Sequence, residues 1–217
     1  AGKVATGGRL NAARTLAAVI DQDPSYAGRE YLAAAAGETL VDDRVRQGPR
    51  QLVIRGPGLV VLEGANVHTG GTRVESGTLV LREPRGLGAG PVEVLDGARL
   101  VLDIGFTTAT VRALARSATG VIDLGTGGIV VAAGGSDETA IREGIRAGRV
   151  PGSVSGIQSS AVSDASRSIG YSVAADGEVR LVFTAPGDLD LDRDVDVLDL
   201  VGMVAAARFG TGVPAGW

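Results

Sequence analysis

The spacing of the hydrophobic residues changes along the chain from a helical period to a strand-like one. Over residues 9–20, apolar side chains recur every three or four positions, which is typical of an amphipathic helix. They are Leu10, Ala13, Leu16, Ala17 and Ile20. An Ala-rich stretch at residues 26–36 predicts a second helix, with Gly37 as its C-cap. From about residue 51 the period becomes two, so we expect a helical segment over residues 1–50 and a β region over residues 51–186.

The β region contains a weak repeat in which a glycine precedes a short apolar run. Gly58, Gly77 and Gly97 open the three best copies and are 19 and 20 residues apart, while residues 120–124 and 128–131 are looser copies. A coil with one or two short strands cannot bury its apolar face alone, so successive coils must stack. The pattern therefore predicts a mainly β fold, a short parallel β-helix (β-solenoid) with N-terminal helices and a C-terminal calcium loop and helix. A β-sandwich is the alternative.

Two short helices are expected to interrupt or cap this β region. Residues 107–118 place Val111, Leu114 and Ala115 on one helical face, and the acids before residues 139–147 suit the first turn of another helix. The Gly/Ser-rich residues 151–168 predict an exposed loop.

A hairpin is expected directly after that loop. Residues 169–173 and 179–183 are apolar runs, and the Asp-Gly pair between them is typical of a tight turn. Pro186 and Gly187 then separate the hairpin from a last region, residues 187–217.

Composition narrows the classes of function. The chain has 34 Gly among 217 residues and only 3% aromatic residues, which indicates many tight turns and a core of small aliphatic side chains. It has no Cys and a single His, so zinc–thiolate sites, cysteine nucleophiles and multi-histidine metal sites are excluded. The formal net charge is −4 without a basic cluster, so we expect neither nucleic-acid binding nor membrane insertion.

The negative charge is concentrated in residues 188–199, which hold six Asp and one Arg. The acids occupy positions 1, 3, 5, 7, 9 and 12 of a twelve-residue loop, and an apolar helical run follows. Ca²⁺ takes six to eight oxygen ligands, and this alternation turns one carboxylate after another toward a common centre. Direct coordination of Ca²⁺ is expected from the side chains of Asp188, Asp190, Asp192 and Asp199. Asp194 is expected to coordinate through its backbone carbonyl, and Asp196 through a water molecule.

This loop and helix resemble the type I dockerin repeat, an EF-hand-like calcium repeat. Arg193 stands where that repeat usually has a glycine, at a position that favours positive φ. Dockerins carry two such repeats, whereas this chain has one. The resemblance therefore gives only weak support to a cohesin-like partner.

Two further stretches resemble known families. Residues 62–81 and 88–102 look like the autotransporter-associated β-strand repeat, which implies a parallel β-helix in an exported, surface or extracellular protein. Residues 2–14, with Gly-Arg-Leu-Asn at their centre, are similar to the last helix of subtilisin-like serine protease domains. The nucleophile, His and Asp segments of that family are missing, so this resemblance implies a C-terminal portion of a larger secreted protease or of a gene derived from one.

Catalytic arrangements have little support in the sequence. A serine triad would need His68 together with one of three serines, Ser159, Ser160 or Ser163, and no spacing favours it. A row of acids on neighbouring coils would be the pattern of a carbohydrate-cleaving β-helix, although acids on a solvent face are common. The candidates are Glu63, Glu75, Glu93 and Asp96.

We therefore expect a non-catalytic extracellular or cell-surface structural module that binds Ca²⁺ and self-associates, for example into a filament. In that assembly the N-terminal segment of one copy docks on its neighbour. The alternative is a C-terminal accessory or anchoring tail of a secreted subtilisin-like protease.

Overall fold

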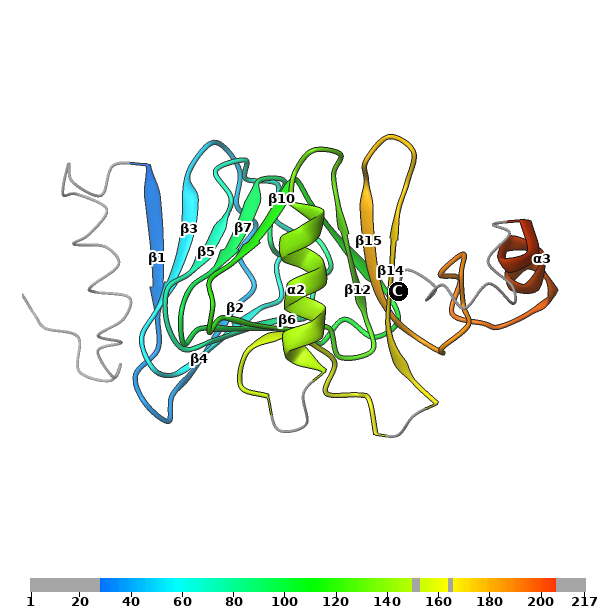
Figure 1. Cartoon of the computed structure of the whole chain (residues 1–217). Helices are drawn as coiled ribbons and strands as arrows, with labels where there is room; N and C mark the ends of the chain where they lie inside the picture. Colours follow the sequence, from blue (N-terminus) through cyan, green and yellow to red (C-terminus); the bar gives the residue numbers. More distant parts are fainter. Residues whose placement is uncertain (1–27, 150–152, 164–165, 206–217) are drawn as a thin grey trace, which may run out of the picture.

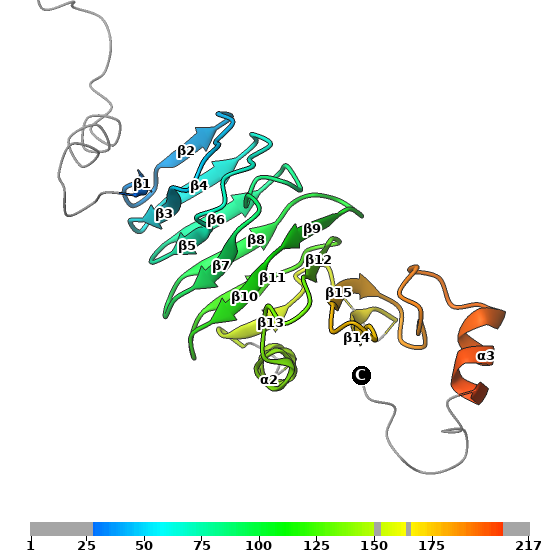
Figure 2. The same ribbon diagram turned by 90° about the horizontal axis from the view of Figure 1, so that it is seen from above.

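The computed structural model describes residues 28–149, 153–163 and 166–205 of the chain. Over these residues the chain winds into a β-solenoid of about five coils, with parallel sheets along its sides (Figures 1 and 2). This confirms the predicted fold class. The helices within the described ranges are short, namely α2 (Glu138–Gly148) and α3 (Val197–Ala205).

Three sheets form the sides of the solenoid. The first holds, in spatial order, β1 (Arg29–Ala33), β3 (Gln51–Arg55), β5 (Thr72–Val74), β7 (Pro91–Val94) and β10 (Ala113–Arg116). The second holds β13 (Gly156–Gln158), β11 (Val121–Asp123), β8 (Arg99–Leu102), β6 (Thr78–Leu81), β4 (Leu59–Leu62) and β2 (Thr39–Asp42). The third holds β14 (Ser168–Val173), β15 (Val179–Thr184), β12 (Gly128–Val131) and β9 (Thr108–Val111). Every pair is parallel except those made by β15 with β12 and with β14.

The core consists of columns of aliphatic side chains, one from each coil. In the second sheet, Leu62, Leu81 and Leu102 occupy the same register position and are fully buried. The predicted repeat is therefore the stack itself. Its glycines turn the corners: Gly77 has a φ of +72°, and a Cβ atom there would clash with the carbonyl oxygen of Gly56.

The predicted helix at residues 26–36 is wrong over its described part, which is strand β1. Each residue of β1 pairs in parallel with one of β3, from Arg29 with Gln51 to Ala33 with Arg55. Pairing along a neighbouring coil outweighs the helix propensity of the alanines. The described solenoid therefore includes β1 and β2 and does not start at residue 51, and Gly37, with a φ of +75°, lies in the turn between β1 and β2. The helix expected at residues 9–20 lies outside the described residues.

Three other predictions near the C-terminal half need correction. Residues 107–118 form strands β9 and β10 rather than a helix, because β10 pairs with β7 of the preceding coil and β9 pairs with β12 of the following one. The loop expected at residues 151–168 contains β13, whose Ile157 is buried. The looser repeat copy at residues 128–131 is β12 of the third sheet, whereas β11 continues the column of β4, β6 and β8.

One end of the stack is closed by α2 and by the β14–β15 hairpin, as the sequence predicts for both elements. The carboxylate of Asp137 accepts the N–H of Thr139 at 2.8 Å and caps α2. Ile141 and Ile145 of α2 are buried, and Gly144 lets the helix approach Ile157 of β13 closely. The hairpin then pairs antiparallel with β12, which ends the parallel order of the third sheet.

The opposite end begins with a coil whose interior is charged. Glu30 and Asp42 lie in register with Leu52 and Leu62 of the next coil. Arg46 is buried with Asp42, whereas Glu30 is partly exposed, and the Arg46 guanidinium reaches Glu30 Oε1 at 3.1 Å and Asp42 Oδ2 at 2.6 Å. Burial raises the pKa of Asp42, but hydrogen bonds from Arg44 and the charge of Arg46 outweigh it and lower that pKa to about 2.

Candidate metal-binding loop

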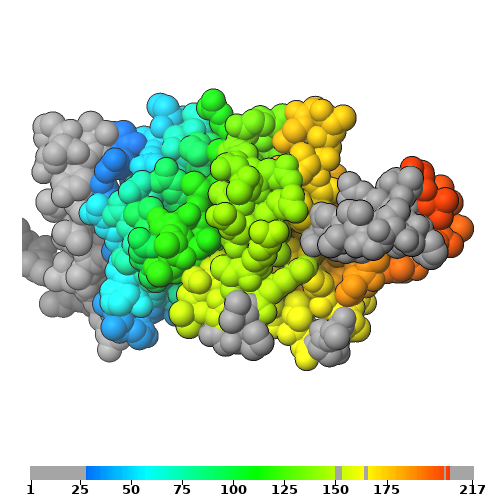
Figure 3. Space-filling model, viewed as in Figure 1, coloured from blue at the N-terminus to red at the C-terminus, as the bar shows by residue number. Residues whose placement is uncertain are grey.

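The acidic segment leaves β15 at the closed end of the stack and leads into α3, which projects away from the solenoid (Figure 3). Asp188, Asp190 and Asp192 each place a carboxylate oxygen within 4.8 Å of those of the other two. Asp188 is buried, whereas Asp190 and Asp192 are exposed. The structure thus brings together three of the six predicted ligands around one point.

The local backbone explains this convergence. The N–H of Asp192 donates to Asp188 Oδ1 and to Asp190 Oδ1, each at 3.2 Å, and the N–H of Asp194 donates to Asp192 Oδ1 at 2.9 Å. Each aspartate therefore accepts a hydrogen bond from a residue two or four positions later, which winds the chain into consecutive turns. The winding leaves alternate carboxylates on the inside of the loop.

The remaining acids have other positions. Asp199 closes the loop, since its carboxylate accepts the N–H of Leu189 at 2.5 Å and that of Asp196 at 2.8 Å. These N–H donors hold the pKa of Asp199 below its ordinary value. Asp196 accepts the N–H of Leu198 at 2.7 Å and so begins α3, and the carboxylate of Asp194 accepts the N–H of Val195.

The electrostatics of the three converging carboxylates favour a cation. The pKa of Asp190 is raised by desolvation and by the negative charges of Asp192, Asp199 and Asp188, against the opposing effect of the hydrogen bond from the Asp192 N–H. Three carboxylates supply part of the oxygen shell that Ca²⁺ takes, and backbone carbonyls or water complete such shells. The donor set is all oxygen, which suits a hard divalent cation such as Ca²⁺ and not a thiolate- or imidazole-binding metal.

Two side chains of the loop attach it to the solenoid, a feature that the sequence analysis missed. Leu191 and Arg193 are the described non-glycine residues with positive φ, at 61° and 83°. Leu191 is buried over Gly170 of β14, where a Cβ atom would come within 2.6 Å of Leu191 Cδ2. The positive φ at Arg193 fits the glycine position of the calcium repeat that this loop resembles.

Arg193 reaches across to the turn between β8 and β9. Its guanidinium donates to the carbonyl oxygen of Phe106 and to that of Thr107 at 3.5 Å, and it lies 5.6 Å from the centre of the Phe106 ring. On the other side of the loop, the hydroxyl of Thr184 at the end of β15 donates to Asp188. The loop is therefore fixed to the hairpin and to a neighbouring coil through three side chains.

Helix α3 has an apolar surface that faces solvent. Five of its side chains are 51–65% exposed, namely Val197, Leu198, Leu200, Val201 and Val204. Its charged residue, Asp199, is buried inside the loop. Clustered exposed apolar side chains of this kind mark an interaction surface.

The other groups singled out by the sequence have structural partners. His68 is buried, with Nε2 at 3.2 Å from Gly71 O and 3.3 Å from Thr72 Oγ1, and burial lowers its pKa. Ser159, the first of the candidate serines, donates instead to Gly125 O at 2.6 Å. These contacts give His68 and Ser159 structural roles in the turns of the solenoid.

The acids of the proposed row are engaged as well. Glu75 pairs with Arg55 at 2.5 Å, Glu93 pairs with Arg73, and Glu63 pairs with Arg82 at 3.0 Å. Asp96 accepts the backbone N–H of Thr119 at 2.9 Å. Arginines that link neighbouring coils thus hold the glutamates.

Comparison of the chain with protein-family models, with curated proteins and with solved structures finds no match. Residues 2–14, which carry the resemblance to the subtilisin-like helix, lie outside the described residues. In the ranges that the structure describes, no helix combines the length and hydropathy needed to cross a membrane.

Proposed function

We propose that the protein is a non-catalytic structural module outside the cell, in which a Ca²⁺-binding loop positions an apolar helix for self-association. The observation that carries this proposal is the arrangement of residues 188–205. Three carboxylates converge in a loop that is fixed to the solenoid, and the helix that directly follows exposes an apolar surface.

The convergence of Asp188, Asp190 and Asp192 supports the calcium part of the proposal. Without a cation, carboxylates within 4.8 Å of one another repel, and a bound divalent ion removes that repulsion. Two of the three are exposed, which favours a weak site rather than a tight one. Extracellular calcium modules have dissociation constants of about 10⁻⁴–10⁻³ M, and this is the affinity that we expect for the site.

The chemistry of α3 supports self-association. Its exposed surface is uncharged and aliphatic over five residues, so a complementary partner is itself apolar. A second copy supplies the same surface, and two such helices related by a twofold axis cover each other. This contact alone gives a closed dimer, because a filament needs a second contact surface on every copy.

Calcium binding is tested by isothermal titration of the full chain with CaCl₂. We expect a single weak site, and we expect the double variant Asp190→Asn/Asp192→Asn to weaken it by at least about tenfold. Asparagine keeps the oxygen that accepts the backbone N–H in the loop and removes only the charge. Asp43→Asn, at an exposed acid in the first coil, is the matched control. Absence of binding heat for the unchanged chain would refute the calcium site.

Self-association is tested by sedimentation velocity, once in Ca²⁺ and once in chelator. We expect a dimer in Ca²⁺ that Val201→Asp dissociates, because a charge on α3 cannot be buried without a partner. Val154→Asp places the same charge at another exposed valine, which is 82% exposed, and leaves the dimer intact. A compact monomer in both buffers would rule out self-association through α3.

A further inference from the structure

The only histidine of the chain, His68, is buried at a corner of the second coil, between the first coil and the third. It is 1% exposed. Backbone hydrogen bonds join this corner to both neighbours, because the N–H of Thr69 donates to Gly48 O at 2.8 Å and the N–H of Ala89 donates to His68 O at 2.9 Å. A movement of this corner therefore affects three coils.

The hydrogen bonds of the imidazole define which of its nitrogens carries the hydrogen. Nε2 lies 3.2 Å from Gly71 O and 3.3 Å from Thr72 Oγ1. Gly71 O can only accept, and the Thr72 hydroxyl donates its own hydrogen to Leu87 O at 2.9 Å, so both neighbours of Nε2 act as acceptors. Nε2 is therefore the N–H of a neutral imidazole, and Nδ1 is the atom that an added proton would occupy.

The environment of Nδ1 does not accommodate that proton. Nδ1 is buried and has no hydrogen-bond partner among the described residues. The backbone of Gly88 packs against this edge of the ring, where a Cβ atom would come within 2.6 Å of Nδ1. A protonated ring in this position would bury both a charge and an N–H group without an acceptor, which is costly.

The charged groups around the imidazole do not offset this cost. Glu30 is the acid that lines the same cavity, and Arg46 engages it at 3.1 Å. In the turn of the third coil, Arg85 pairs with Glu83 at 3.3 Å. Burial lowers the pKa of His68, and the charge of Arg46 lowers it further, against the opposing effects of the hydrogen bond with the Gly71 backbone and of the charge of Glu30.

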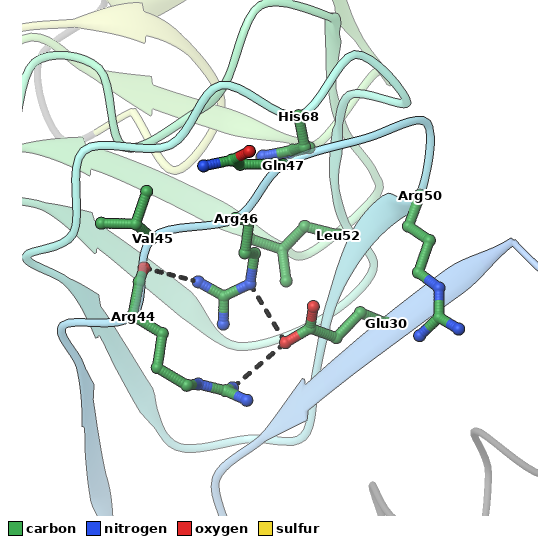
Figure 4. Close-up of a pocket in the computed structure, with 8 residues that line it drawn as sticks. All are labelled: Glu30, Arg44, Val45, Arg46, Gln47, Arg50, Leu52 and His68. Carbon is green, nitrogen blue, oxygen red and sulfur yellow. Dashed lines mark hydrogen bonds and ion pairs between the residues drawn. The ribbon is translucent and has the colours of Figure 1, made fainter.

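The space that a charged ring could enter lies directly beside it. A cavity of about 340 Å³ is built from the first coil and from two residues of the second (Figure 4). Its lining residues are Glu30, Arg44, Val45, Arg46, Gln47, Arg50, Leu52 and His68. Because His68 is itself part of the lining, a rotation of its side chain is enough to bring the ring into this space.

We propose that His68 is an acid-sensitive switch, which holds the first three coils together when it is neutral and opens this corner when it is protonated. The imidazolium leaves its buried position for the cavity, and the hydrogen bonds of the Thr69 and Ala89 N–H groups break. This goes beyond the proposed function, because it involves neither the calcium loop nor α3.

The direction of the pH dependence follows from the two states of the ring. In the open corner the pKa of His68 is close to its ordinary value of 6.5, whereas burial lowers that pKa in the closed corner. The open form therefore binds the proton more readily, and the closed form loses stability as the pH falls below about 6.5. Asp42 acts in a different range, below about pH 4.

The test is NMR of the full chain between pH 7 and about pH 4.5, with Ca²⁺ present throughout. The ring signals belong to a single histidine, so they report its tautomer and its protonation directly. At pH 7 we expect the neutral form with hydrogen on Nε2. Between the two pH values we expect protection of the Thr69 and Ala89 amides, corrected for intrinsic exchange, to fall by at least about tenfold, while that of β15 stays constant.

Two variants separate the titration of His68 from other effects of acid. His68→Gln keeps an N–H donor for Gly71 O and cannot be protonated in this range, so protection of Thr69 and Ala89 should no longer depend on pH. Adding Thr110→His to this variant returns a histidine at an exposed position of β9, and protection should stay independent of pH.

Three results would overturn the proposal. The first is protonation of the ring near pH 6.5 while Thr69 and Ala89 remain protected. The second is no change of their protection over the whole range in the unchanged chain, and the third is the same loss in His68→Gln as in that chain. If His68→Gln does not fold, the unchanged chain still decides, through the ring signals and the comparison of the corner with β15. None of these readings depends on α3, so this proposal and the proposed function fail separately.

Discussion

The first and second coils of the solenoid share a backbone path and differ in what fills it. Where the second coil has Leu52 and Leu62, the first has Glu30 and Asp42 in the same register positions. Arg46 joins the two acids, so the first coil combines an ion cluster with aliphatic core residues such as Leu32, whereas the second coil is aliphatic at all of these positions.

The difference shows how a repeating stack specifies where it stops. Aliphatic layers accept another aliphatic layer on either side, and this is what makes coils stack. A charged layer does not, because adding an apolar coil above it removes water from the ion pairs with no gain in their contacts. The ion cluster therefore disfavours an apolar coil directly beside it.

Substitution of Arg46 should destabilise the first coil more than any other change considered below. Arg46→Leu removes the buried partner of Asp42, while Arg44 still contacts Asp42 and Glu30, so we expect a loss of about 3 kcal/mol in the free energy of unfolding, the lower end for a broken buried pair. Urea denaturation measures it. The triple variant Glu30→Leu/Asp42→Leu/Arg46→Leu makes the first coil resemble the second and should recover most of the loss. A single variant within about 0.5 kcal/mol of the unchanged chain would contradict the ionic layer.

In the aliphatic part of the core, truncating a leucine lowers the stability by leaving a cavity. Leu79 of β6 is fully buried between its neighbours on adjacent coils, and we expect Leu79→Ala to cost about 3 kcal/mol. Val41→Ala, at a valine of the same sheet that is 53% exposed, should stay within about 0.5 kcal/mol. Equal effects of the two in urea denaturation would show that the columns are not the core.

Low pH distinguishes the first coil from the second, because it protonates Asp42 without changing the volume of the side chain. The pKa of Asp42 in the folded state is about 2, below its ordinary value of 3.8, so its contribution to the free energy of unfolding is present above about pH 4 and is lost as the pH falls toward 2. The shift corresponds to roughly 2 kcal/mol. Denaturation curves at both pH values should show this loss for the unchanged chain but not for Asp42→Asn. Parallel pH dependence in the two proteins would refute it.

The smallest change concerns the helix that closes the far end. Asp137→Ala removes the oxygen that accepts the Thr139 N–H, and we expect about 1 kcal/mol of lost stability. Hydrogen exchange over α2 should increase, while that of the first coil stays constant. Glu143→Ala, at an exposed position of the same helix, is the control and should not increase the exchange.

The sequence predicts those strands whose pattern is visible within one coil. The strands that follow Gly58, Gly77 and Gly97 alternate regularly, and all three are found. Residues 26–36 are rich in alanine, and residues 107–118 consist mainly of alanine and small polar residues, so the local pattern predicts helices in both. Their strand conformation depends on pairing with residues about twenty positions away, which no local pattern contains.

The acidic loop also has one feature that the sequence predicts and one that it does not. The convergence of Asp188, Asp190 and Asp192 follows from their alternation in sequence, whereas the attachment of the loop does not. Leu191 needs the space over Gly170, and Arg193 needs the carbonyl oxygen of Phe106, 87 positions earlier. These contacts exist only once the coils have stacked, so the sequence predicts the convergence of the acids but not how the loop is attached to the fold. Binding of Ca²⁺ itself stays a prediction.

The stacking of coils also sets the mechanics of the molecule. Strand β1 and helix α3 lie at opposite ends of the stack (Figure 2), and each coil bonds only to its neighbours. Tension applied between these ends breaks the hydrogen bonds of one coil before those of the next, instead of loading all of them at the same time. Each coil of about twenty residues releases roughly 65 Å of chain, so the molecule yields to a pull in steps and at low force.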